Sequence, residues 1–231
     1  MEKSVYSIVL SDQVVEAVDR MAYSVGTSRS NLINQILAEH LQLMTPEMRM
    51  REIFTAIQQL MEPQFRLMEQ SSEAMMSIKS PVRYKYKPTV RYSIELTRDM
   101  SSRVAKLKVF FRTKSGQLIA DANVFFSGWQ AMEDKYLGGI YKDGVPAASG
   151  EGRYERDFYS PDAAALSDVQ IAGSIAGYIR LMDRCIQLYF DGLSRGKDNG
   201  REIEEEYRRY IKEKGEVPKG PWSYSAKPGV V

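Results

Sequence analysis

Apolar and polar residues alternate over the first ten positions of the chain and then recur at intervals of three and four. The alternation predicts a strand over residues 4–10, with Tyr6, Ile8 and Leu10 on one side and Val5, Ser7 and Val9 on the other. Ser11 stands at an N-cap position and Gly26 at a helix stop, so a helix is expected between them. Ser28 precedes a second helix, whose apolar positions are Leu32, Ile33, Ile36, Leu37 and Leu41.

This short unit buries too little apolar surface to stand alone, so we expect it to dimerise through the strand. Two of its segments, Val5-Tyr6-Ser7-Ile8-Val9-Leu10-Ser11 and Gly26-Thr27-Ser28-Arg29-Ser30, resemble the ribbon-helix-helix family of the MetJ, Arc and CopG repressors, over residues 3–43. The resemblance implies a homodimer whose two strands pair and enter the DNA major groove. It also implies that the N-terminus of the second helix binds a backbone phosphate. By position it implies base-facing residues Val5, Ser7 and Val9 and a phosphate clamp of Thr27, Ser28, Arg29 and Ser30.

Two features of this segment favour a second hypothesis. Of the three base-facing residues only Ser7 can hydrogen-bond a base edge, since Val5 and Val9 offer only methyl contacts. Residues 1–45 also carry a net charge of −2, which opposes binding to phosphates. The alternative function is therefore a dimeric assembly or adaptor protein that uses the N-terminal unit only for oligomerisation.

A connecting amphipathic helix is expected over residues 45–79, starting at Thr45-Pro46 and restarting after Pro63. Methionine is dense along its apolar stripe. This stripe is interpreted as the helical core of the dimer, in preference to an adaptable surface for a partner.

Residues 79–114 carry a net charge of +9, which sets them apart from the rest of the chain. Within them, prolines flank a segment that alternates cations with tyrosines and predicts an extended basic arm or an edge strand. We expect this arm to contact the phosphate backbone of double-stranded DNA. The alternative is a sheet edge protected by its charges. The arm residues are Arg83, Tyr84, Lys85, Tyr86, Lys87 and Arg91.

An antiparallel meander follows, with strands expected over residues 90–96, 104–112 and 118–126; a second copy of the N-terminal module at residues 92–97 is the alternative. Residues 127–160 suggest loops, and Ser160-Pro161-Asp162 suggests the start of a long helix that ends near Gly196. The expected class is α+β. The expected divisions are a ribbon-helix-helix domain (1–44), the connecting helix (45–79), an α+β domain with a basic N-terminal arm (80–196), and a charged helix with a flexible tail (197–231).

Composition excludes several classes of function for this chain of 231 residues and net charge +2. A single histidine and a single cysteine, His40 and Cys185, cannot build a Cys/His zinc site, and a Ser-His-Asp or Cys-His catalytic arrangement would have to use His40, which lies far from Cys185 in the sequence. We therefore expect no enzyme activity, metal or cofactor. The chain lacks an apolar run long enough for a membrane span, so a cytoplasmic, nucleoid-associated protein is expected. The expected partners are double-stranded DNA and a second copy of the chain. A small-molecule or protein effector is left open, and the meander and the long helix would form its pocket.

Overall fold

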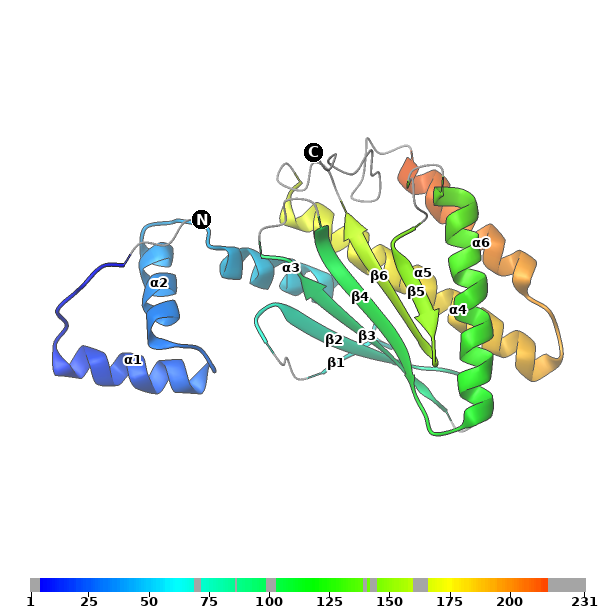
Figure 1. Ribbon diagram of the computed structural model, residues 1–231, viewed down its shortest axis with the longest axis horizontal. Coiled ribbons are helices and arrows are strands. Elements are labelled where there is room, and N and C mark those ends of the chain that lie inside the picture. Colours follow the sequence, from blue (N-terminus) through cyan, green and yellow to red (C-terminus); the bar gives the residue numbers. More distant parts are fainter. Residues whose placement is uncertain are drawn as a thin grey trace, which may run out of the picture. The chain divides into compact units, whose positions relative to one another are not determined.

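The chain divides into two compact units, Met1–Arg49 and Met50–Val231, each described here by itself. The structure is a computed structural model that describes residues 5–68, 72–85, 87–98, 103–138, 141, 145–159 and 166–215 (Figure 1). Six helices and a six-stranded antiparallel sheet among these residues make it a mixed α+β protein, as predicted. The helices are α1 (Asp12–Ser24), α2 (Arg29–His40), α3 (Pro46–Leu60), α4 (Gly116–Leu137), α5 (Asp168–Arg195) and α6 (Gly200–Gly215).

The N-terminal unit contains α1 and α2 at the predicted positions. Gly26 ends the first helical segment with a φ of +66°, a conformation that glycine adopts without steric cost. The Ser28 hydroxyl accepts a hydrogen bond from the Asn31 N–H and so caps α2. Residues 5–10, predicted as a strand, have no strand partner within the described part of the chain and are exposed. The two helices are therefore confirmed, and the strand is not formed by one chain.

The second unit is built on the sheet, in which the strands follow the order β1-β2-β3-β4-β6-β5 and all neighbours are antiparallel. Strands β2, β3 and β4 form a meander that includes the first two predicted strands. The bounds are β1 (Arg66–Leu67), β2 (Met75–Pro81), β3 (Thr89–Leu96), β4 (Arg103–Arg112), β5 (Ala147–Gly150) and β6 (Arg153–Tyr159).

One face of the sheet is covered by helices. Helix α5 passes behind the strands in the view of Figure 1, and α4 contacts β5 and β6. Alternate residues of the strands point toward these helices and form the core, because side chains of a strand alternate between faces. The core includes Tyr92 and Ile94 from β3, Leu107 and Val109 from β4, Tyr154 and Phe158 from β6, and Ile175, Ile179, Met182 and Ile186 from α5.

The predicted connecting helix is wrong in its second half. Helix α3 ends at Leu60, and residues 66–67 and 75–81 belong to the sheet. The apolar stripe of α3 is not a dimer core, because Met50, Ile53 and Ile57 are fully buried within the second unit's own core. Most of the apolar residues after Pro63 therefore lie in β1 and β2, on one side of the sheet, and not in a helix.

The predicted third strand of the meander is also wrong, since residues 118–126 belong to α4. Its buried residues recur at helical spacing, and the Ser115 hydroxyl caps the helix by accepting from the Leu118 N–H. The second-copy alternative is excluded, because residues 103–112, where that copy would need its first helix, form strand β4. Strands β5 and β6 occupy part of the stretch expected to form loops.

Helix α5 begins later than the sequence suggested. Ser167 and Gln170 form a capping box at its start, whereas residues 160–162 lie outside the described part of the chain. Its end agrees with the prediction, since Gly196 adopts the left-handed conformation with a φ of +64°. The charged helix is confirmed as α6, and residues 216–231, expected as a tail, also lie outside the described residues.

Candidate nucleic-acid interface

The turn between α1 and α2 places the four residues of the expected phosphate clamp together. The Thr27 N–H donates to the Ala22 carbonyl, 3.0 Å away, so this N–H belongs to the turn and is not available to a phosphate. The Thr27 and Ser28 hydroxyls both accept hydrogen bonds from Asn31. The N–H groups of the first turn of α2 have no intrahelical acceptor, as at any helix start. Binding of an anion would thus rely on the backbone of Arg29 and Ser30 more than on Thr27.

Arg29 itself is engaged within the unit. Its guanidinium forms an ion pair with Asp19 of α1, and 68% of the arginine side chain remains exposed. This ion pair holds the start of α2 against α1. A phosphate at this helix start would compete with Asp19 for the guanidinium, so Arg29 is a weaker anion ligand than its position alone suggests.

Exposed apolar side chains are concentrated in the N-terminal unit. The predicted base-facing Val5 and Val9 are fully exposed, and Ser7 is exposed between them. The other exposed apolar residues of this unit are Tyr6, Ile8, Leu10, Val14, Met21, Tyr23, Val25, Ile36, Leu37, Leu41, Leu43 and Met44. Such a density on a folded surface indicates an association site.

The prediction that residues 83–91 form an extended arm is wrong. Val82 to Pro88 connect β2 to β3, and the Val82 N–H donates to the Pro88 carbonyl at 2.8 Å. Tyr84 turns inward, with its ring centroid 5.1 Å from that of Phe190 in α5. Arg83, Lys85 and Lys87 are exposed on this connection, while Tyr86 lies outside the described residues. The cations therefore sit on a short hairpin loop.

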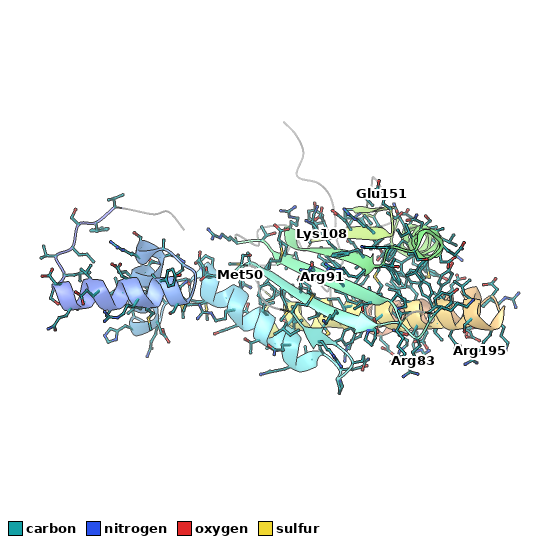
Figure 2. All side chains as sticks on the ribbon, turned by 90° about the horizontal axis from the view of Figure 1, so that it is seen from below. Met50, Arg83, Arg91, Lys108, Glu151 and Arg195 are labelled. Carbon is teal, nitrogen blue, oxygen red and sulfur yellow. The ribbon has the colours of Figure 1, made fainter. Side chains whose placement is uncertain are left out.

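Arg91, the last residue assigned to the arm, lies in β3 on the sheet face opposite the helices. Two lysines on this outer face are paired with acids. Lys106 lies 3.5 Å from Glu155, and Lys108 lies 3.9 Å from Glu95. Figure 2 shows Lys108 and Arg91 on the sheet, Arg83 near the end of β2, and Arg195 at the end of α5. This part of the outer face is balanced in charge.

A second part of the outer face is not balanced. The strand pairing aligns Arg66 with Lys79, Lys79 with Arg91, Arg91 with Phe110, and Phe110 with Arg153. We call these five residues the cross-strand row. No ion pair joins its cations to an acid within the ranges that the structure describes. The row brings together residues that sequence reasoning had not connected, because strand register is not visible in the sequence.

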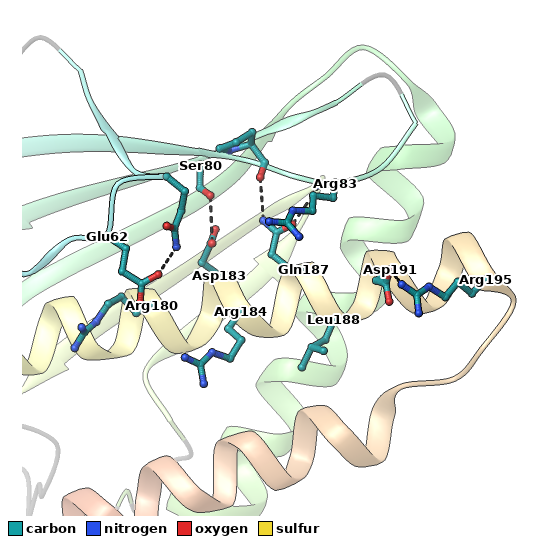
Figure 3. A pocket seen from close by; sticks show the side chains of 12 residues that line it. Glu62, Ser80, Arg83, Arg180, Asp183, Arg184, Gln187, Leu188, Asp191 and Arg195 are labelled. Carbon is teal, nitrogen blue, oxygen red and sulfur yellow. Dashed lines mark hydrogen bonds and ion pairs between the residues drawn. The ribbon is translucent and has the colours of Figure 1, made fainter.

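A cleft of about 520 Å³ lies between the end of β2 and α5 (Figure 3). Many of its polar groups hydrogen-bond or pair with one another. The Gln187 side chain bonds the Pro81 carbonyl and the Arg83 N–H, and Arg195 pairs with Asp191 at 2.9 Å. The cleft occupies the position expected for an effector pocket, between meander and long helix, but its arrangement is typical of a structural junction.

Asp183 forms the floor of this junction. Its carboxylate accepts from the Tyr92 hydroxyl at 2.8 Å and the Ser80 hydroxyl at 3.2 Å, and it is 4% exposed. Burial raises the pKa of Asp183 above its ordinary value, and the hydrogen bonds from Tyr92 and Ser80 partly oppose that rise. These contacts fasten α5 to β2 and β3.

A buried ion pair fastens α4 to β6. The Arg156 Nε lies 3.0 Å from Glu133, and both side chains are at most 1% exposed. The Tyr154 hydroxyl donates to the same carboxylate, and burial beside Glu133 raises the pKa of Tyr154. Burial also raises the pKa of the core thiol of Cys185 to about 12, so it is a poor nucleophile. The buried ion pair and the Cys185 thiol are therefore interpreted as parts of the packed core.

No cluster of metal-binding side chains occurs among the described residues. Within the same ranges, no helix combines the length and apolar character needed to cross a bilayer. Comparisons with family models, curated proteins and solved structures found no match.

Proposed function

We propose that the protein is a homodimeric DNA-binding protein of the ribbon-helix-helix type, acting as a transcriptional repressor or as a plasmid or phage DNA-organising factor. The observation that carries this proposal is the N-terminal unit, in which α1 and α2 flank a glycine turn and follow an alternating segment without a strand partner among the described residues. Pairing of residues 5–10 with the same segment of a second copy would satisfy its backbone groups and cover its apolar side.

The two faces of the paired strands would then have different roles. Tyr6, Ile8 and Leu10 would pack against the helices, leaving Val5, Ser7 and Val9 to face the major groove. Only the Ser7 hydroxyl can donate to or accept from a base edge. Sequence preference would therefore depend on Ser7 and on methyl contacts from the two valines.

Affinity must come from outside the N-terminal unit, because that unit carries a net charge of −2 over residues 1–45. The exposed cations of the β2–β3 connection, Arg83 and Lys85, are suited to contact phosphates without reading bases. Arg91 is held in the sheet and is not assigned to this contact.

Duplex binding, measured by fluorescence anisotropy over a range of salt concentrations, tests this proposal. Arg83→Ala with Lys85→Ala should weaken binding to every duplex and reduce the log–log salt slope by about 1.8. The matched control removes two exposed cations from α6, Arg208 and Lys212, and should leave the slope unchanged. Absence of binding to any duplex at low salt would contradict the proposal and favour the adaptor function.

The role of the ribbon has its own test. Selection from a random duplex pool should return a consensus with two half-sites, since a two-fold dimer reads a two-fold site. Ser7→Ala should change that consensus while keeping its half-site spacing. An identical consensus for both proteins would remove Ser7 from base reading.

A further inference from the structure

We propose that the cross-strand row binds the backbone of single-stranded DNA, with a base stacked at Phe110. This site lies in the second unit and is separate from the duplex contact proposed for the N-terminal unit. The choice of DNA over RNA rests on the proposed function, whereas the path of the strand and the stacked base are inferred from the residues of the sheet.

The charge of the row suits a phosphate chain. Four cations and no acid follow one another across β1, β2, β3 and β6, over a length of about 19 Å for four strand spacings. The Arg91 guanidinium is positioned by a hydrogen bond from its Nη2 to the Ser77 hydroxyl at 3.0 Å, and its buried Nε has no acceptor among the described residues. Its donors are therefore only partly used.

The acids of the outer face confine the path. Glu155 lies two residues beyond Arg153 on β6, and Glu95 lies four residues beyond Arg91 on β3. Both carboxylates belong to the part of the face that pairs with Lys106 and Lys108. A phosphate chain that left the row in this direction would meet negative charge, so the row is the favoured track.

Phe110 makes a single strand a better occupant than a duplex. It lies between Arg91 and Arg153 in the register and is partly exposed, with the Arg91 guanidinium 5.7 Å from its ring centroid. Bases stack on aromatic rings and on guanidinium planes, but the faces of duplex bases are covered by their neighbours. A six-stranded sheet, about 24 Å across, is also too broad for a major groove of about 12 Å.

Anisotropy with a labelled oligothymidylate of about 15 nucleotides tests the charge of the row. Lys79→Gln with Arg153→Gln removes two cations and should weaken binding about 25-fold at about 0.1 M salt, with the salt slope lowered by about 1.4. The matched control is Lys106→Gln with Lys108→Gln, which removes the same charge from the balanced part of the face and should have little effect. Equal losses in both variants would overturn the assignment to the row.

Phe110→Leu tests stacking. This variant should weaken oligothymidylate binding about tenfold and leave the salt slope unchanged, because no charge is removed. An unchanged affinity would overturn the stacking contact. Tighter binding of an oligouridylate of the same length would overturn the choice of DNA.

A duplex measured in parallel separates this proposal from the proposed function. Lys79→Gln with Arg153→Gln should leave the affinity for the selected duplex unchanged. Lack of oligothymidylate binding by a protein that still binds its duplex would overturn the row alone. Oligothymidylate binding without duplex binding would instead contradict the proposed function and support the row.

Discussion

The two units of the chain differ in where their apolar side chains lie, exposed in one and buried in the other. In the N-terminal unit only Ala22, Leu32 and Ala38 are buried apolar residues between residues 5 and 44, whereas most large apolar side chains there are exposed. In the second unit the sheet and helices enclose an extensive apolar and aromatic core. A folded domain needs such a core to offset the entropy of ordering its chain. The second unit therefore has such a core within one chain, whereas the N-terminal unit exposes apolar side chains that the proposed pairing with a second copy would cover.

Glu133→Ala should produce the largest effect on the second unit. It removes the carboxylate that balances the buried Arg156 guanidinium, and loss of one member of a buried pair costs about 3–5 kcal/mol of unfolding free energy. Urea denaturation followed by tryptophan fluorescence measures the change, because Trp129 is buried in the same layer. The loss should be the same at every protein concentration.

The control for this variant is Glu204→Ala. Glu204 pairs with Lys135 at 2.7 Å between α6 and α4, but on the surface, so its removal should have a much smaller effect. Alkylation of Cys185 in the native protein gives an independent measure, since the thiol reacts only when the second unit opens. Similar urea midpoints for the two variants would show that the buried pair does not hold the unit together.

Ile8→Asp should produce the largest effect on the N-terminal unit. Ile8 is 57% exposed in one chain, so the charge costs little there, but a paired ribbon would bury it. The dimer dissociation constant should rise about 100-fold, equivalent to about 2.7 kcal/mol. Analytical ultracentrifugation measures it. Val169→Asp, an equally drastic change at an exposed position of α5, is the control and should leave the dimer intact.

The comparison also separates what the sequence could predict from what it could not. Helix ends with local signals were predicted correctly, as at Ser28 and Gly196, because capping depends on adjacent residues. Residues 118–126 of α4 were predicted as a strand because apolar residues occupy every second position from Leu118 to Phe126. Strand β6 was overlooked because its inward position 156 carries an arginine, which disguises the apolar alternation.

Most of the candidate interface was likewise beyond local sequence signals. The clamp residues are contiguous, and their helix start was predicted. The cross-strand row joins Arg66 to Arg153 through pairings between strands far apart in the chain. Register depends on which faces are buried and on turn geometry, so it becomes visible only in the folded sheet.

Loss of a helix cap should have a moderate effect and should reveal the difference between the units directly. Ser28→Ala and Ser167→Ala each remove a hydroxyl that accepts from the first turn of a helix, α2 in one unit and α5 in the other. Each should cost about 1 kcal/mol. Amide hydrogen exchange should show faster opening of α2 in the first variant, relieved at high protein concentration, and faster opening of α5 in the second, independent of concentration. If exchange depended on protein concentration in both variants, the two units would not differ in their need for a second copy.

Asp183→Asn should have the smallest effect, visible as a change in pH dependence. Burial raises the pKa of Asp183 in the folded chain above the ordinary 3.8, so the folded state binds the proton more tightly than the unfolded state. The resulting stabilisation is fully present below that ordinary value and is lost as the pH rises through the raised pKa. The amide introduced by the substitution does not titrate, so the unfolding free energy of the native protein relative to the variant should fall across this window. Urea titrations at several pH values measure it. Parallel pH profiles for the two proteins would show that another group sets the acid response, and the junction of α5 with β2 and β3 would then be insensitive to the charge of Asp183.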